Sequence, residues 1–147
     1  MQMGTLHPTA ANWFAAAREN CNDAQALAKS HGWRNAYIIA GTAVECALKG
    51  QIMQQLGLNQ WPTIQERREF YTHDLTTLAG LAKLQGALEA AVLQGDVVGG
   101  TWMVAKDFSM NRRYPLNQPF PIKLGRDMVY AVARDGLVEW LIAQKKV

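Results

Sequence analysis

Residues 36–54, AYIIAGTAVECALKGQIMQ, decide the fold, because they form one long helical pattern with a seam of small residues. The seam consists of Ala36, Ala40, Ala43, Ala47 and Gly50. Spacings of four and three residues keep all of them on one helix face, where a second helix backbone can approach closely. The stretch therefore predicts a long helix packed against another helix. It also carries Glu45 and Lys49, a pair of opposite charges one helical turn apart.

The residues before this stretch predict a partner helix over 8–30, because Pro8 suits a first helical turn. An apolar stripe at helical spacing follows it: Phe14, Ala17, Cys21, Ala24 and Ala28. His31 and Gly32 end this helix, and the second helix is predicted over 33–58. So short a break makes the two helices antiparallel neighbours.

The rest of the chain also favours helices. We predict a connector over 59–72, a third helix over 73–84, a broken helix over 87–108 where Gly95, Gly99 and Gly100 interrupt the pattern, a proline-rich loop over 111–121 and a last helix over 123–146.

Four tryptophans are predicted to lie in the core: Trp13, Trp33, Trp102 and Trp140. Trp61 is predicted to be exposed. Asp135 falls on the apolar stripe of the last helix and is expected to be buried or half-buried, either paired with Arg113, Arg126 or Lys49 or satisfied at a dimer interface.

No segment is typical of a strand. The sequence predicts an all-α protein, an antiparallel up-and-down bundle of four to five helices in a single domain spanning 1–147. The 147 residues are 49% hydrophobic and 18% charged, which is a globular composition. The formal net charge of +3 permits contact with phosphate or RNA.

Spacing and composition also exclude several classes of site. Cys21 and Cys46 form no C-x-x-C motif, so we interpret them as reduced, buried residues. Neither a secretion signal nor a membrane span is evident, and we expect a soluble, cytoplasmic protein. The glycines do not form a phosphate loop, and no metal-ligand spacing is present. We therefore expect no metal and no cofactor.

Three segments occur in the order typical of a known family: residues 43–50 (AVECALKG), 73–75 (HDL) and 113–115 (RYP) before the final helix. In this order and spacing, the chain resembles HEPN domains, from about Trp13 to Trp140. The resemblance implies a helical bundle, often a homodimer, which we expect to form through the long helices. Many such domains cleave RNA in toxin–antitoxin and defence systems. Others accompany a minimal nucleotidyltransferase or bind a nucleotide-like ligand.

The resemblance implies three functions for this chain. The first is a non-catalytic module that binds a nucleotide, RNA or a protein partner such as a minimal nucleotidyltransferase. The second is a metal-independent ribonuclease, because family ribonucleases carry Arg and, four to six residues later, His, as Arg68 and His73 do here. This match departs from the family pattern in two ways. His73 opens the predicted third helix, whereas the family motif usually lies on a later helix, and Glu69 replaces the polar residue that usually follows the arginine. The third is a purely structural assembly subunit.

The candidate site residues have structural as well as functional interpretations. His73 is a general base or phosphate ligand, or a residue that orders the start of a helix. Asp74 is a ligand contact or complements the helix dipole. Glu45 and Lys49 contact a ligand or form a structural ion pair. Arg113 and Tyr114 clamp a phosphate and stack on a base, or pin the last helix.

Overall fold

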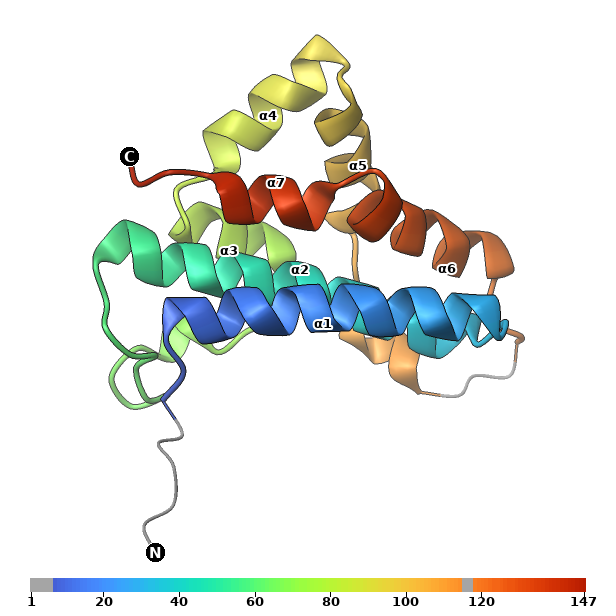
Figure 1. Cartoon of the computed structure of the whole chain (residues 1–147), viewed down its shortest axis with the longest axis horizontal. Coiled ribbons are helices and arrows are strands. Elements are labelled where there is room, and N and C mark those ends of the chain that lie inside the picture. Colours follow the sequence, from blue (N-terminus) through green and yellow to red (C-terminus); the bar gives the residue numbers. More distant parts are fainter. Residues whose placement is uncertain (1–6, 115–117) are drawn as a thin grey trace, which may run out of the picture.

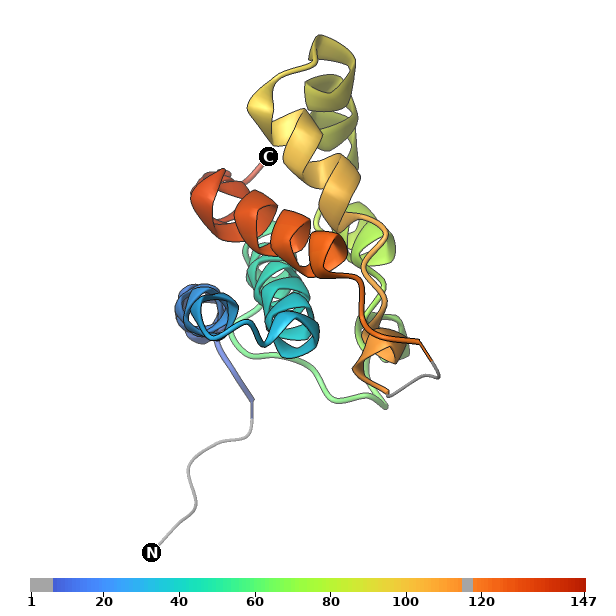
Figure 2. The same cartoon turned by 90° about the vertical axis from the view of Figure 1, so that its right-hand side faces the viewer.

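Two long antiparallel helices, α1 (Ala10–Lys29) and α2 (Trp33–Leu56), form the framework of the protein. They lie side by side in both views of the computed structural model, which describes residues 7–114 and 118–147 (Figure 1, Figure 2). Helix α1 begins with a capping box in which Thr9 accepts a hydrogen bond from the backbone of Asn12. Pro8 thus precedes the cap and does not occupy the first turn. Helix α2 ends at Gly57, whose φ of 67° is left-handed.

The sequence predicted that the seam of small residues on α2 contacts another helix closely, and this contact is confirmed at Gly50, which meets α1. All four alanines of the seam are fully buried. A Cβ atom added at Gly50 would lie 2.4 Å from the Phe14 ring of α1, so only glycine fits at this point. On the same helix, a Cβ atom at Gly41 would lie 2.1 Å from the Phe108 ring. The two glycines let large aromatic side chains pack directly on the α2 backbone, which fixes how closely the neighbouring segments approach.

The remaining helices cover α2 from the other side. They are η1 (Arg68–Phe70), α3 (Leu75–Leu81), α4 (Gln85–Gln94), α5 (Val97–Ala105), η2 (Met110–Arg113), α6 (Ile122–Val129), the π-helical stretch η3 (Tyr130–Arg134) and α7 (Leu137–Ala143). Helices α4 and α5 form a hairpin that projects from the body in both views (Figure 1, Figure 2). No strand occurs in residues 7–114 and 118–147, so the prediction of an all-α protein is confirmed for that part of the chain.

The predicted broken helix is two separate helices. Gly95 has a left-handed φ of 69° and ends α4, and the Asp96 side chain then accepts a hydrogen bond from Gly99 N at 2.8 Å to begin α5. A Cβ atom at Gly99 would lie 2.3 Å from the Ala91 carbonyl oxygen, so the two helices meet closely at this residue. The predicted third helix is shorter at both ends, and Asp74 caps its start.

The prediction of one last helix over 123–146 was wrong. A π-helical stretch shifts the register, and Gly136, with a φ of 86°, separates α6 from α7. This shift takes Asp135 off the apolar stripe, and its side chain pairs with Arg134 at 3.2 Å instead of with a cation across the bundle. The chain leaves α7 at Ala143, and the buried Gln51 side chain donates hydrogen bonds to the carbonyl oxygens of Leu141 and Gln144.

The core contains one of the four tryptophans predicted to be buried, Trp102, while the other three are only partly buried. Cys46 is buried as predicted, Cys21 is partly buried, and both thiols are free. In the part of the chain that the structure describes, no helix is both long enough and apolar enough to cross a membrane.

Candidate functional site

The candidate site begins at a chain of three polar side chains that links α2 to the start of α3. Lys49 Nζ lies 2.9 Å from one oxygen of the Glu45 carboxylate, and His73 Nδ1 lies 2.8 Å from the other. Lys49 and Glu45 are almost completely buried, whereas the His73 side chain is 57% exposed. A carboxylate oxygen accepts hydrogen bonds, so the Glu45 contact places the proton of a neutral His73 ring on Nδ1 and leaves Nε2 free to accept one.

An aromatic wall surrounds the buried Lys49. Its Nζ lies 5.2 Å from the ring centre of Trp13 and 5.6 Å from that of Trp61, which are cation–π distances. Trp61 is therefore only 4% exposed, and the prediction that it is exposed was wrong. The connector folds back over α2, Trp61 N donates to the Pro8 carbonyl oxygen at 2.7 Å, and the indole ring also packs on Phe70. Lys49 and Glu45 thus support His73 from the interior and do not themselves face solvent.

His73 also lines a shallow polar groove between the start of α3 and the segment that joins α5 to η2. Its other lining residues are Thr72, Asp74, Thr76, Lys106, Asp107, Phe108, Ser109, Met110 and Asn111. Asp74 has a structural role here, because its side chain accepts a hydrogen bond from Thr77 N at 3.1 Å and caps α3.

Tyr37 holds the far wall of this groove in place. Its hydroxyl oxygen accepts a hydrogen bond from Ser109 N at 2.9 Å, which ties the segment before η2 to the buried side of α2. Burial raises the pKa of Tyr37, so the hydroxyl stays neutral near pH 7 and remains compatible with its apolar surroundings. Phe108 packs on the same ring, with 5.2 Å between the ring centres.

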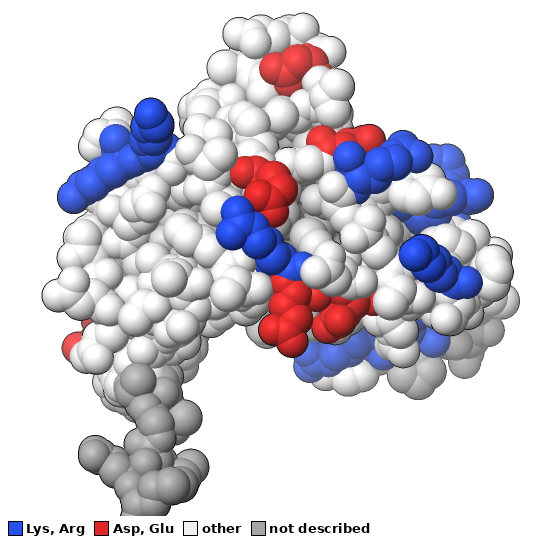
Figure 3. All heavy atoms as spheres, viewed as in Figure 1, with Lys and Arg blue, Asp and Glu red and all other residues white. Residues whose placement is uncertain are grey.

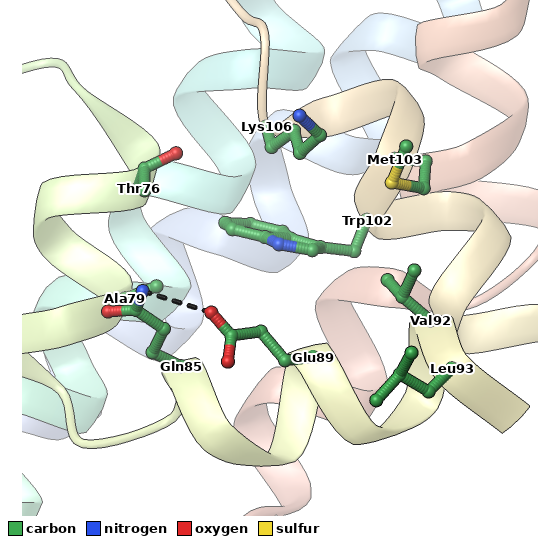
Figure 4. Close-up of a pocket in the computed structure, with 9 residues that line it drawn as sticks. All are labelled: Thr76, Ala79, Gln85, Glu89, Val92, Leu93, Trp102, Met103 and Lys106. Carbon is green, nitrogen blue, oxygen red and sulfur yellow. Dashed lines mark hydrogen bonds between the residues drawn. The ribbon is translucent and has the colours of Figure 1, made fainter.

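A second cavity, of about 480 Å³, continues the polar groove toward the α4–α5 hairpin. Figure 4 shows the Trp102 indole ring across its centre, with Lys106 on one side and Glu89 on the other. Val92, Leu93 and Met103 form an apolar wall, and Gln85 donates a hydrogen bond to Glu89 at 3.2 Å. Thr76 and Lys106 line both the cavity and the groove. The two hollows therefore adjoin, with a polar half at His73 and an apolar half at Trp102.

Basic residues gather beyond the polar half. Lys and Arg atoms crowd the right-hand end of the molecule, where α1 ends and α6 begins (Figure 3). The exposed basic residues on α1, η2 and α6 there include Lys29, Arg112, Arg113 and Arg126. The Arg113 guanidinium lies 4.7 Å from the ring centre of Tyr114, and this tyrosine is 51% exposed. Arg113 and Tyr114 thus form a stacked, solvent-facing pair that directly follows the groove residue Asn111.

Arg68 is placed differently from the other candidates. It lies on η1 and is exposed, and none of the side-chain hydrogen bonds or ion pairs found among the described residues joins it to His73. Its neighbour Arg67 forms an ion pair with Glu69 at 3.2 Å. The described residues include no group of three or more His, Cys, Asp or Glu side chains arranged to hold a metal ion.

The pairing of Glu45 with Lys49 was predicted from their spacing and is confirmed, but the contact of His73 with Glu45 was not predicted. Lys106 and Trp102 were not predicted as lining residues, because neither belongs to a motif and the turn at Gly95 brings both to the cavity beside the groove. No protein-family model, curated protein or solved structure matches this chain.

Proposed function

We propose that this protein is a non-catalytic, HEPN-like module that binds a nucleotide or a short single-stranded RNA segment. The observation that carries the proposal is that Met110 and Asn111 of η2 line the groove with His73 and Lys106, and that Arg112, Arg113 and Tyr114 follow them directly in the chain. Arginine and lysine side chains bind phosphate, and an exposed tyrosine ring provides a face on which a base stacks. The adjoining cavity at Trp102 offers apolar space for a second base.

The buried ion pair supports this assignment by fixing the histidine. Because Lys49 balances the charge of Glu45, the carboxylate can orient His73 without a net buried charge. His73 and Lys106 line the same groove, where the lysine ammonium would donate a hydrogen bond to a phosphate oxygen.

The test is fluorescence anisotropy with a labelled single-stranded RNA of about ten nucleotides, measured across a range of salt concentrations. Changing Tyr114 to Ala removes the stacking face and should weaken binding about 5- to 100-fold. The double variant Arg112→Ala/Arg113→Ala should weaken binding and also reduce its salt dependence.

The matched control is Lys145→Ala/Lys146→Ala, which removes the same charge at the exposed C-terminal end, far from η2 (Figure 1). We expect this control to bind nearly as well as the wild type. Equal losses in both double variants would show nonspecific attraction to a basic protein, and an absence of binding to RNA and to mononucleotides would rule out the proposed function.

The Glu45–His73 contact also favours a second candidate function, the metal-independent ribonuclease. A histidine whose Nδ1 is held by a carboxylate, in a polar groove, has the arrangement of a general base. RNA cleavage in the presence of EDTA that is lost in His73→Ala would support this candidate. Comparison with Arg68→Ala would then decide whether the arginine takes part.

A further inference from the structure

Helix α5 is apolar on every side but is covered on only one. Its sequence, VVGGTWMVA, contains no charged residue. Gly99, Thr101, Trp102 and Ala105 are buried, whereas Val97 is 66% exposed, Met103 49% and Val104 36%. A helix that is hydrophobic all round is normally buried on all sides. No described residue covers the exposed side of α5, so we expect another molecule to cover it.

The exposed apolar surface extends to both neighbours of α5. Leu93, at the end of α4, is 89% exposed, and Tyr130, at the start of η3, is 38% exposed. Val97, Gly100, Val104 and Tyr130 also line one groove, which joins the α5 part of the surface to η3. We call this surface the α5 face, and it consists of Leu93, Val97, Gly100, Met103, Val104 and Tyr130.

The size of the α5 face suits an interface. Large apolar and aromatic residues have areas of about 150–250 Å², so the exposed fractions amount to on the order of 500 Å². This lies near the upper end of the largest apolar patch on a typical monomer, about 300–600 Å². A specific interface takes about 800 Å² from each partner, of which the α5 face would supply the greater part.

We propose that a second copy of this chain covers the α5 face in a two-fold symmetric dimer. A two-fold contact places a surface against itself, so an edge with charges of only one sign would repel its own copy. The edge of the groove carries Asp127 and Asp135 together with Arg134, which pairs with Asp135 within the chain, so this edge is of mixed sign and compatible with its own copy. A partner recognised by a strongly acidic or basic surface would instead meet an edge of one sign.

Gly100 gives the dimer its point of close approach. It lies between Val97 and Val104 on the exposed side, and a Cβ atom added there would meet no atom within 4 Å. Packing within this chain therefore does not require glycine at this position, whereas close crossing of two α5 helices would. The long helices are a poorer interface, because most of α2 is already buried beneath α1 and the other helices. This dimer differs from the one expected from the sequence. Leu93 and Met103 also line the cavity at Trp102, so the dimer interface and the proposed base-binding cavity share one edge, but the tests below use no RNA.

The test uses two glycines that differ mainly in location. Gly100 and Gly86 are both exposed and helical, and each has open space where a side chain would begin. Gly100→Arg would place a long charged side chain in the centre of the α5 face, whereas Gly86→Arg would place it at the start of α4, outside that face. Arginine is a better helix former than glycine, so neither change should disturb folding, and circular dichroism checks this.

Analytical ultracentrifugation at about 1 to 100 μM should show a wild-type dimer. The dissociation constant should rise at least about tenfold in Gly100→Arg and stay unchanged in Gly86→Arg. A monomeric wild type at the highest concentration would overturn the proposal. A Gly100→Arg protein that dimerises normally, or equal weakening by both substitutions, would overturn the assignment of the interface to this face.

A second measurement uses cysteine cross-linking. Under mild oxidation, Gly100→Cys should form an interchain disulfide because the proposed two-fold axis passes near this residue, whereas Gly86→Cys should not. Failure of Gly100→Cys to cross-link faster than Gly86→Cys would contradict the proposed crossing of the two α5 helices.

Discussion

Removal of the buried cation at Lys49 tests the central feature of the site. In Lys49→Met the side chain keeps its length and its packing against Trp13 and Trp61, but the Glu45 carboxylate loses one of its two partners. Leaving one member of a buried ion pair without its partner costs about 3–5 kcal/mol. His73 still hydrogen-bonds to the carboxylate and offsets part of this cost. We therefore expect the free energy of unfolding to fall by about 2–4 kcal/mol.

The opposite substitution and the double variant separate burial from attraction. Glu45→Gln removes the negative charge that balances Lys49 and leaves the ammonium with an amide oxygen and its two aromatic neighbours, each a weaker partner than a carboxylate, so a loss of similar size is expected. In Glu45→Gln/Lys49→Met both charges are gone. Because the buried site then contains no unpaired charge, the double variant should be within about 1 kcal/mol of the wild type.

Urea denaturation followed by circular dichroism measures these differences. The control is Lys123→Met, because Lys123 and Asp127 have the same spacing of four residues but lie exposed on α6. This change should alter the free energy of unfolding by no more than about 0.5 kcal/mol. The reasoning is refuted if Lys49→Met is as mild as Lys123→Met, or if the cost of the double variant equals the sum of the two single costs.

Three further properties can be predicted from the packing. Gly99→Ala should destabilise the protein by at least about 2 kcal/mol, because its Cβ would collide with the Ala91 carbonyl, whereas Gly100→Ala should stabilise α5 slightly; thermal unfolding compares the two. Burial raises the thiol pKa values from 9.0 to about 12 for Cys21 and about 11 for Cys46, so alkylation at pH 8 should be at least about 100-fold slower in the native protein than in urea. Above pH 9 the two thiols lose their protons more readily in the unfolded chain than in the native protein. The free energy of unfolding should therefore fall as the pH rises, and denaturation at several pH values measures this fall. Gln51→Met should cost about 2–3 kcal/mol and speed hydrogen exchange in residues 141–147, because the carbonyl oxygens of Leu141 and Ile142 lose the Gln51 donor and that of Gln144 retains only Gln54.

The sequence by itself determined the helices whose signals are local. Helical spacing of small residues predicted α2 and its close contact with α1, and glycine at positions 32 and 95 marked helix breaks near those found. The pairing of Glu45 with Lys49 could also be predicted, since residues four apart on a helix are neighbours. These features depend on residues close together in the chain, which is why periodicity was enough to find them.

Only the tertiary structure decided what surrounds these residues. Periodicity could not show that the connector folds back to bury Trp61 beside Lys49, or that His73 reaches Glu45 across 28 positions. It also could not show that a π-helical stretch and Gly136 divide the last helix, because the register changes only where α6 and α7 pack on α2. The cavity at Trp102 exists because the hairpin of α4 and α5 brings Trp102 and Lys106 to α3, and such long-range contacts arise from packing the whole chain, not from the preference of any short segment.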